Sequence, residues 1–272
     1  MRLLECVIAS KNGVLLKNRD RAYFPHLYIY RVIQPTSEIV FLYDSVTGWA
    51  EGMNSNGIAI VNSALIVQRD EREHKIAREK GKKSDDGKII VEALKKKSIK
   101  DILDTILYFK GGLQGHTFVN YKGTLYKIEK IPDKHSIRKS KSGKFFARTN
   151  HGIDFPNEGY ASGIGYLSTR YRLKQTLDKL KDSDPEEWHE EMKVQKYDPS
   201  STLNVVRDSK LFTSSQLLMD VKKLSFNVYI VKKKALYMGL KTVNKGNKDR
   251  DLIKINVTEF TPKHHQDFDI KD

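Results

Sequence analysis

The sequence has only one cysteine among its 272 residues, Cys6, so no disulfide can form within the chain and a disulfide-stapled secreted scaffold is excluded. It also lacks any uninterrupted apolar run close to the roughly 18 residues of a membrane-spanning helix. Residues 1–10 are too short and too interrupted by charge for a signal peptide. We therefore expect a cytoplasmic protein with no membrane partner.

The composition is that of a folded protein with a basic surface. Hydrophobic residues make up 39% of the chain and aromatic residues 10%, which excludes disordered, collagen-like and coiled-coil proteins. The length fits one large domain or two small ones. Lysine and arginine number 49 against 34 acidic residues, so the net charge is +15 and polyanions are attracted.

Strand-forming residues dominate the first quarter. Residues 3–9 are apolar apart from Glu5, and Asn12-Gly13 has the chemistry of a tight turn before residues 14–16, so this segment predicts a β-hairpin with Cys6 in its first strand. Further strands are predicted at residues 27–33, 39–43, 58–62, 116–121, 124–131, 216–220, 226–231 and 235–240.

Helical patterns occupy the middle of the chain. Residues 98–111, 167–180 and 184–196 predict three helices, whereas residues 69–83 mix both charge signs and predict a solvated segment. The order of strands, helices and strands favours a single α+β domain. A polar tail is expected from residue 245.

Cys6 is followed fourteen positions later by Asp20, within Lys17-Asn18-Arg19-Asp20. On these features alone a structural interpretation is the stronger one, because a lone buried cysteine is usually a small core residue. Further motifs follow along the chain. They are Gly52-Met53-Asn54-Ser55-Asn56-Gly57 with Asn62-Ser63, Arg148-Thr149-Asn150-His151-Gly152, Ser168-Thr169-Arg170-Tyr171 and Thr213-Ser214-Ser215.

In this joint order the motifs resemble the N-terminal nucleophile (Ntn) hydrolases of the choloylglycine hydrolase, penicillin V acylase and acyl-CoA:isopenicillin N acyltransferase group. The resemblance extends from Cys6 to about Leu240. It implies a four-layer αββα sandwich of two mainly antiparallel sheets between helices. It also implies that residues 1–5 are a leader removed by autoprocessing and that residues 6–244 form the catalytic domain, followed by the tail at 245–272.

The physical reason for exposing Cys6 is that a thiol needs a base. An unperturbed thiol has a pKa of about 8.5 and is mostly protonated at neutral pH, whereas an α-amino group has a pKa of roughly 7.7–8.0. The amine of the same residue can therefore accept and return the proton. The resemblance implies that Cys6 attacks a linear, non-peptide amide and forms an acyl-enzyme, which water or another acceptor then resolves.

The resemblance also implies roles for other residues. Asp20 would orient the amine, Asn150 would donate to the oxyanion with Asn62 assisting, and Arg170 would support the site electrostatically. One departure concerns the bile-salt and penicillin V branch, which has an arginine three positions before the aspartate, where this chain has Lys17 and places Arg19 next to Asp20. Which cation supports the site stays open, and so does the choice between hydrolysis and acyl transfer. The expected pocket residues are Tyr23, Phe24 and His151.

Two alternatives remain at this point. Cys6 could pair with His116 or His151 in a thiolate-imidazolium couple that needs no leader removal. The basic segments at 69–100 and 232–234 could instead bind nucleic acid or another anion, although no nucleic-acid-binding motif accompanies them. The expected partner is a small amide or acylated amine. No cofactor or metal is expected, and a homo-oligomer is possible.

Overall fold

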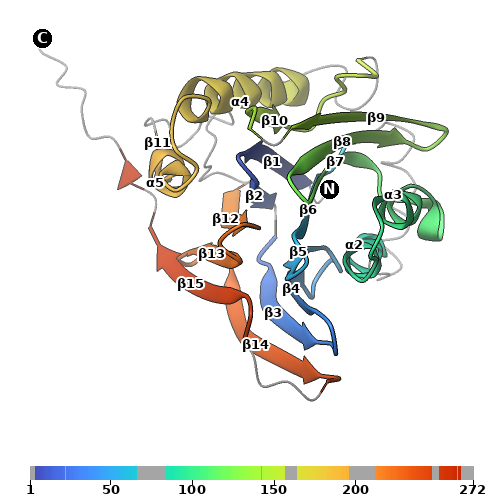
Figure 1. The fold of residues 1–272 in the computed structure, drawn as a ribbon. Helices are drawn as coiled ribbons and strands as arrows, with labels where there is room; N and C mark the ends of the chain where they lie inside the picture. The colour runs from blue at the N-terminus through green and yellow to red at the C-terminus, as the bar shows by residue number, and fades with distance from the viewer. Residues whose placement is uncertain are drawn as a thin grey trace, which may run out of the picture.

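Two β-sheets packed face to face, with helices on both outer sides, form the fold (Figure 1). The computed structural model describes residues 4–21, 23–65, 84–141, 143–156, 164–195, 212–246, 251–261 and 263–264. The solvated segment expected at 69–83 lies outside these residues. Within them, no helix is long and apolar enough to cross a membrane.

The first sheet, sheet A, has six strands in the order β10, β1, β2, β12, β13, β15. In that order they span Phe146–Arg148, Leu4–Lys11, Val14–Arg21, Phe212–Asp220, Ser225–Val231 and Lys254–Phe260. The predicted hairpin joins β1 to β2, and Asn12 and Gly13 both have positive φ, as a tight turn between twisted strands requires. β15 runs parallel to β13, so the tail expected from residue 245 contains a strand of this sheet.

The second sheet, sheet B, has eight strands in the order β14, β3, β4, β5, β6, β7, β8, β9. In that order they span Leu236–Asn244, His26–Ile33, Glu38–Asp44, Ala50–Asn54, Ile58–Ser63, Gly115–Tyr121, Thr124–Ile131 and Lys134–Lys141. Only β14 pairs in parallel within this sheet, with β3. A short parallel pair, β11 (Val194–Gln195) and β16 (Lys263–His264), completes the described strands.

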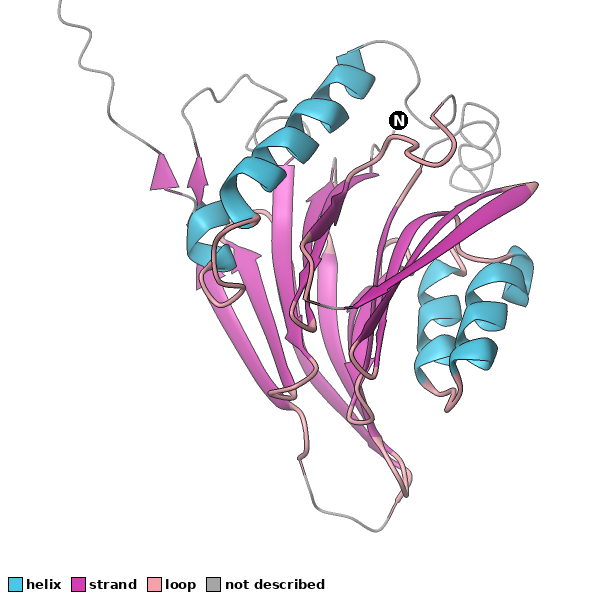
Figure 2. Cartoon of the chain, turned by 45° about the horizontal axis from the view of Figure 1, so that its top comes forward, coloured by secondary structure: helices cyan, strands magenta, loops and turns pink. Residues whose placement is uncertain are grey.

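Figure 2 shows helices on the outer sides of the two sheets, and three apolar clusters fill the spaces between these layers. The inter-sheet cluster includes Ile8 and Leu15 of sheet A and Val61 and Leu125 of sheet B. A second cluster packs α2 (Asp86–Leu94) and α3 (Ile99–Tyr108) on the outer face of sheet B. A third packs α4 (Ile164–Leu180) and α5 (Trp188–Lys193) on the outer face of sheet A. The expected α+β class and αββα layering are therefore confirmed.

Local differences from the sequence expectation concern the least periodic segments. α2, β5 and β9 were not predicted. The helix expected at 184–196 begins only at Trp188, because Asp184 accepts the N–H of Glu186 in a preceding turn and Val194 already belongs to β11. The helix expected at 98–111 is α3, whose N-cap Ser98 accepts the N–H of Asp101.

Candidate active site

Cys6 lies in β1 directly opposite Arg19 of β2. Opposed residues of an antiparallel pair share a face, and neighbours along a strand alternate between faces. Cys6 therefore shares its face with Ile8, which belongs to the inter-sheet core. The cysteine is only 2% exposed, so its sulfur lies at the inner side of sheet A.

The sulfur has a guanidinium beside it. Arg21 donates from Nη1 to the Sγ of Cys6 at 3.5 Å and to the backbone oxygen of Asp20 at 2.8 Å. Burial lowers the pKa of Arg21, but Tyr23, Cys6 and Asp44 outweigh it and raise that pKa above its ordinary value. Arg21 is therefore charged, and a cation next to a cysteine stabilises the thiolate form that acts as a nucleophile.

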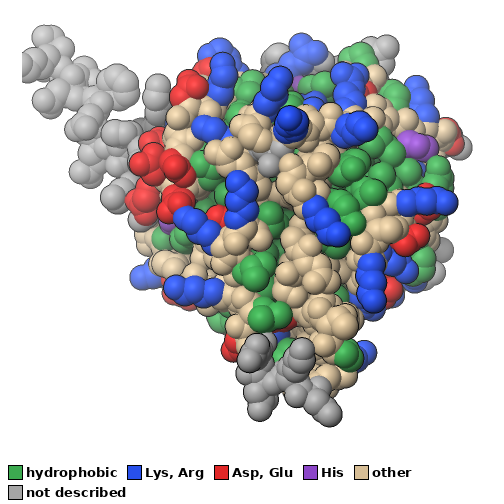
Figure 3. Space-filling view, viewed as in Figure 1, with side chains coloured by type: hydrophobic (Ala, Val, Ile, Leu, Met, Phe, Trp, Pro, Cys, Tyr) green, Lys and Arg blue, Asp and Glu red, His purple; other side chains and the backbone are tan. Residues whose placement is uncertain are grey.

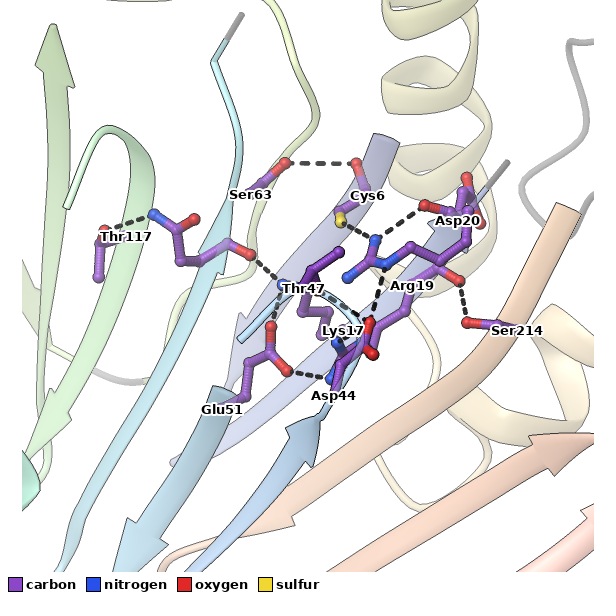
Figure 4. Close-up of polar contacts among 12 residues, drawn as sticks. Cys6, Lys17, Arg19, Asp20, Asp44, Thr47, Glu51, Ser63, Thr117 and Ser214 are labelled. Carbon is purple, nitrogen blue, oxygen red and sulfur yellow. Dashed lines mark hydrogen bonds and ion pairs between the residues drawn. The ribbon is translucent and has the colours of Figure 1, made fainter. Parts of the chain in front are cut away.

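A buried ionic cluster continues from this point along β2 (Figure 4). Lys17 binds one oxygen of Glu51, and Arg19 donates to the other oxygen at 2.8 Å. Arg19 also lies 3.6 Å from a carboxylate oxygen of Asp44. Burial opposes ionisation of Glu51, yet Arg19 and Lys17 together lower the pKa of its carboxyl group.

The cations of this cluster outnumber its carboxylates. With every group ionised, three cations of β2 face the two carboxylates of Asp44 and Glu51, which leaves a charge of 3 − 2 = +1. All five side chains are at most 1% exposed. Uncompensated buried charge is costly, and burial accordingly lowers the pKa of Lys17 below its ordinary value.

The backbone nitrogen of Cys6 is held from a different direction. Its N–H donates to Oδ1 of Asn150 at 3.1 Å, and Arg172 donates from Nη2 to the same oxygen at 3.0 Å. Arg172 also donates to the carbonyl of Cys6 and to Oδ2 of Asp20, both at 3.4 Å. The second oxygen of Asp20 accepts the hydroxyl of Thr213 at 2.7 Å.

The amide of Asn150 is oriented by these partners. Its oxygen faces two donors, and its nitrogen donates to the backbone oxygen of Ala64 at 2.7 Å and to Oγ of Ser63 at 3.2 Å. In this arrangement Asn150 holds the nitrogen of Cys6 through its oxygen. The oxyanion role expected for its amide nitrogen would require that nitrogen to leave Ala64 and Ser63.

Asp20 lies on the other face of sheet A from the sulfur. It is directly opposite Glu5 in the register, whereas Cys6 is opposite Arg19. The carboxylate of Asp20 therefore belongs to the side of the strand that faces α4 and Arg172. This position suits an interaction with the nitrogen of Cys6 rather than with its sulfur.

The arginine of α4 that reaches this group is Arg172 and not Arg170. Arg172 is fully buried, whereas Arg170 is exposed and lines a surface cavity. Residues two positions apart lie on different sides of a helix. The buried residues Thr169, Arg172 and Thr176 follow the three- and four-residue spacing of one helix face, but because all three are polar, no apolar pattern in the sequence marks that face.

Asn62 is close to the cluster, but its side chain turns towards β7. Its amide nitrogen donates to Oγ1 of Thr117 at 2.9 Å and to the carbonyl of Gln114 at 3.1 Å. Its own backbone oxygen accepts from Lys17. The adjacent Ser63 makes the contact to the nucleophile strand, since its hydroxyl lies 3.4 Å from the carbonyl oxygen of Cys6.

The expected pocket residues have different environments. The hydroxyl of Tyr23 binds Asp44 and lies 3.0 Å from Oγ1 of Thr47, and burial is the main cause that raises the pKa of Tyr23 to about 12. Phe24 is 46% exposed. His151 lines a cavity of about 430 Å³ next to α4, and burial is the main cause that lowers its pKa to about 4.

The two candidate histidines face groups other than a thiol in their principal contacts. Nε2 of His116 lies 2.8 Å from the carbonyl oxygen of His151, and Nδ1 lies 3.6 Å from the carboxylate of Glu129. Nδ1 of His151 lies 3.0 Å from Oγ1 of Thr169. Among the described residues, no group of three His, Cys, Asp or Glu side chains could hold a metal ion.

Comparison with known proteins adds a distant structural similarity. No protein-family model matches the chain, and no curated protein matches it. Among solved structures it is similar to penicillin V acylase from Agrobacterium tumefaciens, with 12% identical residues and a TM-score of 0.42, over 93% of this chain and 99% of that chain. A similarity this distant assigns no activity, so the function has to be argued from the geometry around Cys6.

Proposed function

We propose that this chain is an Ntn hydrolase or acyltransferase that uses Cys6, after removal of residues 1–5, to cleave a linear, non-peptide amide through an acyl-enzyme. The single observation that carries the proposal is the pair of side chains on the Cys6 nitrogen and carbonyl. Asn150 and Arg172 come from distant parts of the chain and meet at these backbone atoms. Core packing of the Cys6 side chain alone would not require these contacts to its backbone atoms.

Leader removal would be the first reaction. The Cys6 sulfur attacks the carbonyl carbon of Glu5, a thioester forms, and the peptide C–N bond breaks while the Cys6 nitrogen takes up a proton. Water then hydrolyses the thioester, which returns the thiol and leaves a free α-amine. Asn150 holds that nitrogen before cleavage, and Asp20 lies opposite Glu5 on β2, where Arg172 joins its carboxylate to the carbonyl of Cys6.

Amide cleavage would use the same atoms. The α-amine takes the thiol proton, the thiolate attacks the substrate carbonyl, and the departing amine is protonated by the α-ammonium group. Water or an acceptor amine then attacks the thioester and frees the sulfur. Arg21 supports the thiolate, and the acceptor decides between hydrolysis and acyl transfer.

Intact mass of the purified full chain tests the proposal. We expect a species that lacks residues 1–5 in the wild type and the unprocessed chain in Cys6→Ala, with Asp20→Asn processed more slowly or turning over more slowly. A screen of acyl-amide substrates should then show turnover that Cys6→Ala abolishes. Amide cleavage by a chain that keeps residues 1–5 would instead favour the cysteine–histidine alternative, and activity retained in Cys6→Ala would reject the nucleophile.

A further inference from the structure

A group of like charges lies at the edge of the inter-sheet space, away from the ionic cluster of Cys6. Lys127 of β8 is directly opposite Arg138 of β9. Lys127 is two positions after Leu125, a residue of the inter-sheet core, so Lys127 and the opposed Arg138 are on the inner face of sheet B. Like charges at directly opposed positions destabilise a sheet.

Sheet A adds a third cation from the facing side. Arg148 of β10 is opposite Ile8 of the inter-sheet core, so its side chain is on the inner face of sheet A. Phe146, two residues earlier on the same face, lies under the ammonium group of Lys127, which is 3.6 Å from the ring centroid. This contact brings the inner faces of β8 and β10 together at the edge of the sandwich.

Two carboxylates lie in this region, and they offset its cations only in part. Asp154 lies 2.6 Å from Nη2 of Arg138. Glu129 accepts the backbone N–H groups of Ile153, Asp154 and Phe155. With exposed Lys144 included, the region has four cations and two carboxylates, a net charge of 4 − 2 = +2.

Burial and neighbouring cations lower the pKa values of Lys127 and Arg148. Burial lowers the pKa of Lys127, and Arg148, Arg138 and Lys144 lower it further against the single opposing effect of Asp154. Burial is the main cause that lowers the pKa of Arg148, and Asp154 and Glu129 offset it only in part. Lys and Arg side chains are dense along the upper edge of Figure 3, above α4, β9 and β10 of Figure 1.

We propose that Lys127, Arg138 and Arg148, with Lys144 at the rim, form a binding site for a phosphate group of a small molecule. Arginine presents a planar set of donors that matches phosphate oxygens, and lysine adds a mobile point charge. A doubly charged phosphate would balance the surplus of +2. The site does not depend on the proposed function, although Arg148 shares the inner face of sheet A with Cys6 and would place the ligand on the nucleophile's side.

Calorimetric titration of the full chain with pyrophosphate at fixed ionic strength tests the site. Lys127→Gln should weaken binding by at least about tenfold, because a hydrogen bond to a charged group is lost. The matched control is Lys139→Gln. Lys139 is the next residue after Arg138 on β9 and faces the opposite side of the sheet, so this variant removes an equal charge and should leave the affinity unchanged.

Thermal unfolding gives a second measurement, in which Lys127→Gln should stabilise the protein although it weakens binding. Without ligand, Lys127→Gln should raise the melting temperature by about 1–3 °C, because relief of the repulsion with Arg138, Arg148 and Lys144 outweighs the lost contact with the Phe146 ring. If Lys127 only stabilised the fold, the same substitution would lower the melting temperature. If Lys127→Gln does not fold, Arg138→Gln tests the same loss of affinity.

Other ligands distinguish the source of the phosphate. Inorganic phosphate that binds as tightly as pyrophosphate would assign the site to the free ion, and weaker binding would assign it to a polyphosphate group; both support phosphate recognition. The proposal is overturned if pyrophosphate does not bind or if both lysine variants weaken it equally. It is also overturned if a short oligonucleotide binds while pyrophosphate does not.

Discussion

Arg172 donates to the amide oxygen of Asn150 at 3.0 Å, and the N–H of Cys6 reaches that same oxygen at 3.1 Å. One guanidinium therefore fixes the amide that holds the nucleophile's nitrogen, while its other nitrogen contacts Asp20. This arrangement makes Arg172 the residue through which α4 controls the geometry of β1.

The first prediction concerns Arg172→Met. Loss of the guanidinium leaves the buried carboxylate of Asp20 without this partner, so we expect the free energy of unfolding to fall by about 3–5 kcal/mol. Leader removal should slow at least about tenfold, because the Cys6 nitrogen loses its fixed acceptor. Urea denaturation measures the first effect and a time course of intact mass the second.

Arg170→Met is the comparison on the same helix. Arg170 is exposed, and exposed substitutions usually change stability by no more than about 0.5 kcal/mol. Its effects should therefore be much smaller than those of Arg172→Met. Equal effects of the two variants would contradict the assignment of Arg172, and a larger effect of Arg170→Met would restore the expectation from the sequence.

A second prediction concerns the amide of Asn150. Asn150→Asp keeps an acceptor for the Cys6 nitrogen but replaces the donor to Ala64, whereas Asn150→Ala removes both. If the oxygen is the important atom, Asn150→Asp should process its leader faster than Asn150→Ala. If Asn150 instead acts as an oxyanion donor, both should lose about 10²–10³-fold in kcat with little change in KM. Steady-state kinetics and intact mass separate these outcomes.

Much of the fold could be predicted because its signals are local. The Asn12-Gly13 turn and the alternating apolar residues around it specify the hairpin of Cys6, and Ser98 marks the start of α3. β9 could not be found in this way, because its exposed, lysine-rich sequence is that of a solvated segment and only pairing with β8 makes it a strand.

The sequence predicts those site residues whose type itself indicates a chemical role. Cys6, Asp20 and Asn150 were predicted and do meet, through Arg172. Glu51 was missed because its role comes from tertiary pairing with Lys17 and Arg19. Its one sequence signal is a carboxylate inside β5, where every residue is buried.

A third prediction tests that pairing. Glu51→Gln leaves Lys17 and Arg19 as buried cations without this carboxylate, so the free energy of unfolding should fall by about 3–5 kcal/mol. Lys17→Met should cost less, because Glu51 keeps Arg19 and an unfavourable buried cation is removed. In the double variant the two losses should not add. Urea denaturation of the four proteins checks the cycle, and additive losses would contradict direct coupling.

The last prediction is a pH dependence caused by His116. Burial is the main cause that lowers its pKa from 6.5 to about 4, so between these values the unfolded chain binds the proton more readily than the folded chain. The free energy of unfolding should therefore fall as pH is lowered through this window, with His116 contributing about 3 kcal/mol by pH 4.

His116→Gln removes this titration and should flatten the pH dependence, even if the lost contact to the His151 carbonyl lowers stability at pH 7. His135→Gln is the control, because His135 is exposed on β9 and should leave the slope unchanged. Chemical denaturation at pH values from 4 to 7 gives the comparison. Parallel curves for wild type and His116→Gln would mean that His116 is not held neutral by burial, and the slope would then have to come from other groups such as His151.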